Sequence, residues 1–272
     1  MDVIDFRITL RTPCALKEYT PKPTPQLERY VTLYKMKDRL TYQTPEETIA
    51  EMNAAGITEA VLTSKDADGN EFVAEMAQNY PEFTPIAGAT LDHGVMHAYN
   101  VLKKALKTGE FFGFNFAGLF QHPPMALDDP KLYPLYALCV DHDVCAIVHS
   151  SLHYYVGGKH ILNNILRSDN IAVDFPDLRL VLSHAGNGWG TLPLVLAQRH
   201  PNVYLDVNAV KPKHFPPEYI HALNKFLKHK FIFGTCYPHF PFSIIDEWKW
   251  HVEDKNHELF FYDNAMRALG KS

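Results

Sequence analysis

Short apolar runs rich in β-branched residues alternate with longer segments of helical periodicity along the whole chain. Runs of this kind are typical of parallel strands that are buried on both faces. The strands are expected at residues 3–8, 59–63, 84–89, 111–116, 144–150, 178–183, 203–207 and 231–234. Eight strands alternating with helices predict a single-domain α/β fold over residues 1–272, a (β/α)8 TIM barrel.

The segments between these strands carry the helix pattern. Thr44 stands before Pro45 and three residues before Glu47, an arrangement that satisfies the free backbone donors at a helix start. Helices are expected at residues 45–56, 71–80, 133–141, 159–170, 189–200, 217–229, 244–253 and 262–269. The proline-rich segment 11–43 does not fit this alternation, and we interpret it as a lid over the barrel mouth or an oligomer contact.

Composition narrows the choice of partner. The 272 residues carry a formal net charge of -5 and no block of Lys and Arg, which argues against nucleic acid and favours a small molecule. The acidic start and the absence of about 18 consecutive apolar residues predict a protein that is neither exported nor membrane-spanning. The four cysteines form no CxxC pair and no dense framework, which indicates reduced thiols and a cytoplasmic location.

Polar side chains stand at the carboxyl ends of several predicted strands. In a closed barrel these ends meet at one mouth, where catalytic groups are placed. The strand ends carry Arg7, Asn115, His149, His184, Asp206 with Asn208, and Cys236. We therefore expect one site built from residues that are far apart in the chain.

Two of these strand ends carry histidines. His149 ends the run Cys145–Ser151, and His184 is followed by the glycines of the segment Leu180–Trp189, which let the backbone approach a ligand closely. Each imidazole is suited to bind a metal or to move protons. The alternative for each is a structural hydrogen bond.

These two segments, together with residues 203–206, 233–238 and 263–267, resemble the amidohydrolase-related family over nearly the whole chain. That family includes metal-dependent hydrolases and decarboxylases related to aminocarboxymuconate semialdehyde decarboxylase. The resemblance implies the barrel fold and a divalent metal, usually zinc, that activates water or positions a carboxylated substrate. It also implies that His149 is a metal ligand and that His184 is the acid/base histidine.

The chain departs from the family pattern at three ligand positions. The family's first strand ends in Asp-x-His-x-His, whereas this chain has Asp5, Arg7 and Thr9 at the corresponding positions. The family's last ligand is an aspartate in a Gly-Ser-Asp-Tyr/Trp-Pro stretch, and Cys236 stands there instead. These departures leave open whether zinc, another divalent metal or no metal is bound.

The substituted residues suggest their own chemistry. Arg7 repels a cation and is suited to bind a carboxylate, although an ion pair with Asp5 or Asp206 is the alternative. Cys236 has three possible roles: it completes a metal site with His149 and His184, acts as a nucleophile, or is an inert buried thiol.

Further candidates for substrate contact are Asn115, at the end of the fourth strand, and His153 and Tyr154, on the loop after His149. His153 and Tyr154 either line the mouth or occupy a loop without a role in the site.

The leading hypothesis is an amidohydrolase-related hydrolase that acts on a small carboxylated or lactone-like metabolite, with decarboxylation as the second choice. Arg7 would bind the anion, His184 would transfer protons, and Cys236 would belong to a metal or thiol centre. The alternative is a barrel that has lost catalysis and binds a carboxylated metabolite or a protein partner at the same mouth. The resemblance also makes a homodimer a reasonable expectation.

Overall fold

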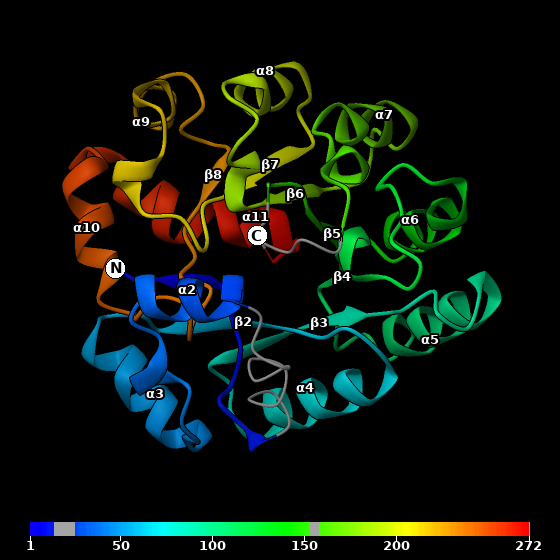
Figure 1. Ribbon diagram of the computed structural model, residues 1–272, viewed down its shortest axis with the longest axis horizontal. Coiled ribbons are helices and arrows are strands. Elements are labelled where there is room, and N and C mark those ends of the chain that lie inside the picture. The colour runs from blue at the N-terminus through cyan, green and yellow to red at the C-terminus, as the bar shows by residue number, and fades with distance from the viewer. Residues whose placement is uncertain (14–24, 153–157, 272) are drawn as a thin grey trace.

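The computed structural model describes residues 1–13, 25–152 and 158–271 of the chain. Its centre is one parallel sheet in which eight strands follow one another in chain order (Figure 1). The strands are β1 (Ile4–Ile8), β2 (Glu59–Thr63), β3 (Phe83–Gly88), β4 (Gly113–Phe116), β5 (Cys145–His149), β6 (Leu180–Ser183), β7 (Val203–Asp206) and β8 (Phe231–Ile232). This order confirms the predicted TIM barrel.

Backbone contacts close the sheet on itself. The Phe6 N–H on β1 donates to the Phe233 carbonyl just after β8, at 3.0 Å, and Ile8 forms a parallel bridge with Tyr237. The side chain of Asp5 strengthens the same seam, because it accepts hydrogen bonds from the Thr235 N–H at 2.8 Å and the Thr235 hydroxyl at 2.5 Å. β8 has only two residues, and these contacts with β1 come from the segment that follows it.

Helices surround the sheet in the predicted alternation. They are α2 (Pro25–Leu33), α3 (Pro45–Ala54), α4 (Ala67–Asn79), α5 (Val95–Leu106), α6 (Tyr133–Asp141), α7 (Leu166–Asp174), α8 (Leu192–Arg199), α9 (Pro217–Asn224), α10 (Ile244–His251) and α11 (Asn264–Leu269). The Thr44 capping box predicted for α3 is present. α5, which begins after Gly94 without a side-chain cap, is not among the helices expected from the sequence.

The expected helix over residues 159–170 is wrong in its extent. A short 3-10 helix, η4 (His160–Asn163), comes first, and α7 starts only at Leu166. Asn164 interrupts the helix with an extended ψ of 128° and accepts a hydrogen bond from the Leu166 N–H. An asparagine side chain that binds a backbone N–H competes with helix continuation.

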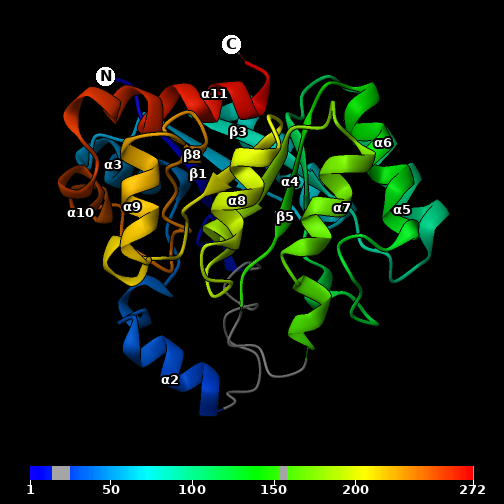
Figure 2. The same cartoon turned by 90° about the horizontal axis from the view of Figure 1, so that it is seen from above.

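The barrel interior is apolar and is closed at one end by α11. Inward residues of six strands pack together with Ala265, Ala268 and Leu269 of α11; they are Ile4, Phe6, Val61, Ile86, Cys145, Ile147, Val181 and Ile232. Figure 2 shows α11 across one end of the barrel and α2 projecting from the opposite end. The open mouth therefore lies on the side of α2, at the carboxyl ends of the strands.

The described part of the excursion 11–43 lies at this mouth. Tyr34 packs edge-on against Phe240, with ring centroids 5.4 Å apart. Arg39 donates hydrogen bonds to the carbonyls of Pro238 at 2.9 Å, His239 at 2.8 Å and Tyr34 at 2.8 Å. These contacts join the excursion to the loop after β8. No helix in the described residues is long and apolar enough to cross a membrane.

Candidate active site

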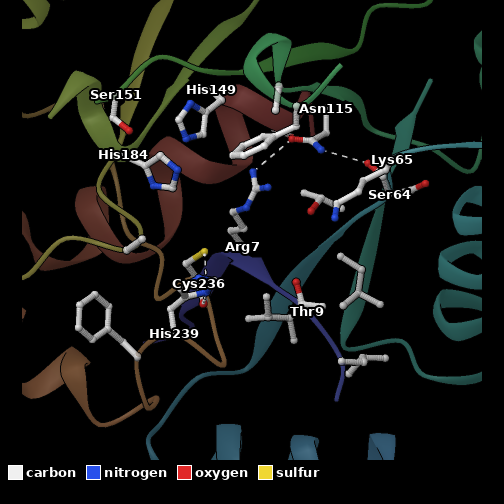
Figure 3. Close-up of a pocket in the computed structure, with 18 of the residues that line it drawn as sticks. Arg7, Thr9, Ser64, Lys65, Asn115, His149, Ser151, His184, Cys236 and His239 are labelled. Atoms are coloured by element: carbon white, nitrogen blue, oxygen red, sulfur yellow. Dashed lines mark hydrogen bonds between the residues drawn. The ribbon is translucent and has the colours of Figure 1, made fainter. Parts of the chain in front are cut away.

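The strand-end residues selected from the sequence converge on one cavity. It has a volume of about 1980 Å³ and lies at the carboxyl ends of the strands. Arg7, Asn115, His149, His184 and Cys236 all line it, although they come from five different strands or strand ends (Figure 3). His153 and Tyr154 lie outside the described residues.

Arg7 enters the cavity from β1 and is held by neutral partners. Its Nη1 donates to Asn115 Oδ1 at 3.2 Å and to Ser183 Oγ at 3.5 Å. Asn115 is itself fixed, because its Nδ2 donates to the Ser64 carbonyl at 3.0 Å. Both ends of the Asn115 amide are therefore occupied within the protein. The arrangement orients the guanidinium and leaves its charge without a carboxylate counter-ion among these partners.

Two buried aspartates lie beneath the cavity. Burial raises the pKa of Asp5 and of Asp206 to about 7 each. Asp206 accepts a hydrogen bond from the Asn208 N–H at 2.9 Å and also binds the Asn208 side-chain amide. The predicted alternative, an ion pair that ties Arg7 to Asp5 or Asp206, is not formed within the described residues. The charge of Arg7 opposes the rise in the pKa of Asp206, and the Ser183 hydroxyl, which accepts from Arg7, donates to Asp206 Oδ2 at 3.5 Å.

His149 and His184 form a pair with their ring centroids 4.8 Å apart and an interplanar angle of 70°. His149 ends β5 and is buried, with 7% of its surface exposed. Its Nδ1 lies 2.8 Å from Asn163 Nδ2. His184 follows β6, and its Nδ1 lies 3.0 Å from the Asn208 carbonyl oxygen. Each ring is thus held at Nδ1 by a neighbouring asparagine.

The backbone at His184 has an unusual conformation. His184 and Ala185 have φ angles of 60° and 48°, in the left-handed region that residues other than glycine rarely adopt. Such conformations persist where the surrounding structure enforces them, and they occur often at functional sites. Here the turn at the end of β6 directs His184 into the cavity beside His149 (Figure 3).

Cys236 lines the same cavity as Arg7 and the histidine pair, and it lies below His184 in the view of Figure 3. Its φ is 58°, and its Sγ lies 3.6 Å from His239 Nδ1. Burial raises the pKa of the thiol to about 11, although the charge of Arg7 acts in the other direction. Cys236 is therefore a neutral thiol near pH 7, and this does not support its predicted role as a thiolate nucleophile.

The predicted metal set of His149, His184 and Cys236 does not fit a metal ion in this geometry. No group of three or more His, Cys, Asp or Glu side chains in the described residues is placed to hold one. Arg7 introduces a fixed positive charge into the same cavity, close enough to Cys236 to act on its pKa, and this charge repels a cation. The expectation of zinc at these three residues is thus not supported.

Sequence reasoning missed three residues that shape the site. Ser64, Ser183 and Asn163 hold Asn115, Arg7 and His149, respectively. Ser64 follows the predicted strand 59–63 and Ser183 ends the predicted strand 178–183. Their positions at strand ends could therefore have marked them as site residues. Asn163 lies 14 residues beyond His149, in a segment expected to be helix, and nothing in its local pattern marks it.

Comparison with known proteins gives one family and several similar structures. A sequence model described as amidohydrolase matches residues 4–271. An uncharacterized TIM-barrel protein from Bordetella bronchiseptica is 27% identical with a TM-score of 0.78, and the match covers 100% of this chain and 99% of that protein. A dihydroxybenzoic acid decarboxylase from Polaromonas sp. JS666, solved with bound manganese and the inhibitor 2-nitroresorcinol, is 15% identical with a TM-score of 0.71 and coverage of 99% and 96%.

A curated relative is the 2-keto-4-carboxy-3-hexenedioate hydratase of Sphingobium sp. (strain NBRC 103272 / SYK-6). It is 28% identical, and the match covers 44% of this chain. Only 41% of the hydratase's own length is included in that match.

Proposed function

The chain belongs to the amidohydrolase family, and we propose that it is an enzyme that adds water to a small carboxylated metabolite, by hydrolysis or hydration. The observation that carries this proposal is the position of Arg7. Its guanidinium lies at the barrel mouth, held by Asn115 and Ser183, with the histidine pair on one side of it. A guanidinium in a fixed orientation recognises a carboxylate through paired hydrogen bonds.

The comparisons support the substrate class. The curated relative acts on a carboxylated keto acid, as its name states, and the Polaromonas protein is a decarboxylase of an aromatic acid. Arg7 supplies the feature that recognition of such acids requires, and the cavity of about 1980 Å³ has room for a molecule larger than a single carboxylate. A carboxylate bound to Arg7 would place the rest of the substrate near the two imidazoles.

His184 is the proposed general base. Its Nδ1 faces the Asn208 carbonyl, which can only accept a hydrogen bond, so the neutral ring carries its proton on Nδ1. The lone pair is then on Nε2. An imidazole in this form takes a proton from water while the water oxygen attacks the substrate, and it returns the proton in a later step.

The test is a turnover screen on purified protein with lactones, unsaturated polycarboxylates and aromatic acids. Oxygen-18 incorporation from labelled water and CO2 release are measured in parallel. We expect a product that contains oxygen from water, with loss of turnover in His184→Gln. Release of CO2 without incorporation would contradict water addition and identify the second choice from the sequence, a decarboxylase. Saturable binding without turnover would identify the non-catalytic binding barrel.

A further inference from the structure

We propose that Asn163 is a positioning residue that makes His149 the hydrogen-bond donor of the histidine pair. In this arrangement the Asn163 Nδ2 donates to His149 Nδ1, so the ring proton of the neutral imidazole must lie on Nε2. The consequence for the reaction rests on the proposed function: His149 Nε2–H donates to a substrate oxygen while His184 Nε2 acts as the base.

The contact is built into the protein interior. Asn163 is the last residue of η4, and none of its surface is exposed. Its Nδ2 lies 2.8 Å from His149 Nδ1, a normal hydrogen-bond distance. Placing a polar amide in a buried position costs free energy unless it is hydrogen-bonded. The bond to His149 meets that requirement for one of the two N–H groups of Nδ2.

The orientation of the Asn163 amide decides which nitrogen of His149 carries the proton. As the structure has it, Asn163 Oδ1 is buried without a hydrogen-bond partner in the described ranges. Rotating the amide by 180° would instead leave both N–H donors of Nδ2 at that position. Buried carbonyls are left under-satisfied more often than buried N–H groups, so the orientation with Nδ2 facing the ring is favoured.

His184 shows the opposite arrangement. The Asn208 carbonyl accepts from His184 Nδ1–H at 3.0 Å, which leaves the lone pair on Nε2. When both rings are neutral, these two imidazoles, whose centroids lie 4.8 Å apart, carry their protons on different nitrogens. One presents an acceptor and the other a donor. Acid–base catalysis of water addition needs both functions, one to take a proton and one to stabilise negative charge on oxygen.

The experiment is a long-range ¹H–¹⁵N correlation spectrum of the full-length protein labelled with ¹⁵N-histidine, near pH 8. The spectrum distinguishes the two neutral tautomers, and His149→Gln and His184→Gln assign the two signals. We expect Nε2–H for His149 and Nδ1–H for His184. Nδ1–H for both rings would overturn the proposal, and this result requires no variant of Asn163.

Two variants test the role of Asn163 itself. Asn163→Asp offers only acceptors, so we expect His149 to change to Nδ1–H while His184 keeps its tautomer. Asn163→Leu removes the contact at similar volume, and we expect a mixture of tautomers at His149 alone. An unchanged His149 signal in both variants would show that Asn163 does not set the tautomer.

Kinetics separate positioning from simple structural support. With a substrate found in the screen, we expect Asn163→Asp to lower kcat by roughly 100-fold, the lower end of the range for loss of one acid–base function, with KM changed much less. Equal kcat in Asn163→Asp and wild type would overturn the catalytic consequence. A screen without turnover would reject the proposed function, whereas the tautomer spectrum would still decide whether Asn163 orients His149.

Discussion

Arg7 replaces a histidine of the family pattern, and this single change alters what the mouth of the barrel can bind. Its guanidinium bonds to Asn115 and Ser183, which orient it without neutralising its charge. We expect Arg7→Gln to raise KM for a carboxylated substrate roughly 100-fold, because loss of one partner of a desolvated charge pair costs about 2–5 kcal/mol. Steady-state kinetics measures this effect. Arg7→Lys keeps the charge but loses the planar guanidinium that forms paired hydrogen bonds. Its KM should therefore lie between those of wild type and Arg7→Gln.

The thiol of Cys236 provides a second prediction at this scale. Because its pKa is raised to about 11, alkylation by iodoacetamide at pH 7 should be slow and should accelerate up to about pH 11. Peptide mass spectrometry measures the rate at Cys236 separately from that at buried Cys139 and Cys145. A midpoint below pH 8 would instead identify an activated thiolate and restore the nucleophile hypothesis.

Site residues at the ends of strands could be predicted from the sequence, whereas a supporting residue between strands could not. Arg7, His149 and His184 were predictable because strand ends of a barrel meet at one mouth, whatever their separation in sequence. Asn163 was not, because it reaches His149 from η4, which lies in a segment whose pattern predicts helix. Side chains that support a site from such segments depend on tertiary packing, which periodicity does not encode.

The contacts between β1 and the segment after β8 should make the stability of the folded protein depend on pH. Asp5 on β1 binds both the N–H and the hydroxyl of Thr235, and its pKa is raised from 3.8 to about 7 by burial. The folded state therefore holds this proton more tightly than the unfolded state does. The contribution to stability is fully present below about pH 4 and is lost as the pH rises through about 7.

Asp5→Asn tests this linkage, because an amide has nearly the shape of the protonated acid and does not ionise. Between pH 4 and 7 the free energy of unfolding should fall less steeply in the variant than in wild type, by up to about 1.4 kcal/mol per pH unit. Urea unfolding at several pH values measures the difference. Parallel curves for the two proteins would mean that Asp5 keeps an ordinary pKa.

At the same scale, strands were easier to predict than helices. Strands buried on both faces leave continuous apolar runs, and each of the eight was located to within a few residues. α5 was not predicted, although its buried residues Ala98, Leu102, Ala105 and Leu106 recur at helical spacing. The roles of segment 11–43 as a lid or an oligomer contact, and the homodimer, stay predictions.

The two ends of the barrel have different roles: the end covered by α11 contributes to stability, and the open mouth holds the candidate active site. Leu269 of α11 is 2% exposed and packs inside the barrel with the inward residues of the strands. Its helix lies at the end of the barrel opposite α2 (Figure 2). Leu269→Ala should lower the free energy of unfolding by about 3 kcal/mol, the usual cost of a buried leucine truncation. Chemical denaturation measures it, and kcat should be unchanged under conditions where the protein is folded.

Val173→Ala is the matched control, because Val173 lies on α7 with 53% of its surface exposed. Its effect on the free energy of unfolding should stay within about 0.5 kcal/mol. If Leu269→Ala lowered the free energy of unfolding as little as Val173→Ala does, the packing of α11 inside the barrel would not stabilise the fold. If it lowered kcat in fully folded protein, the two ends of the barrel would be coupled, and the division between a stabilising end and a chemical end would fail.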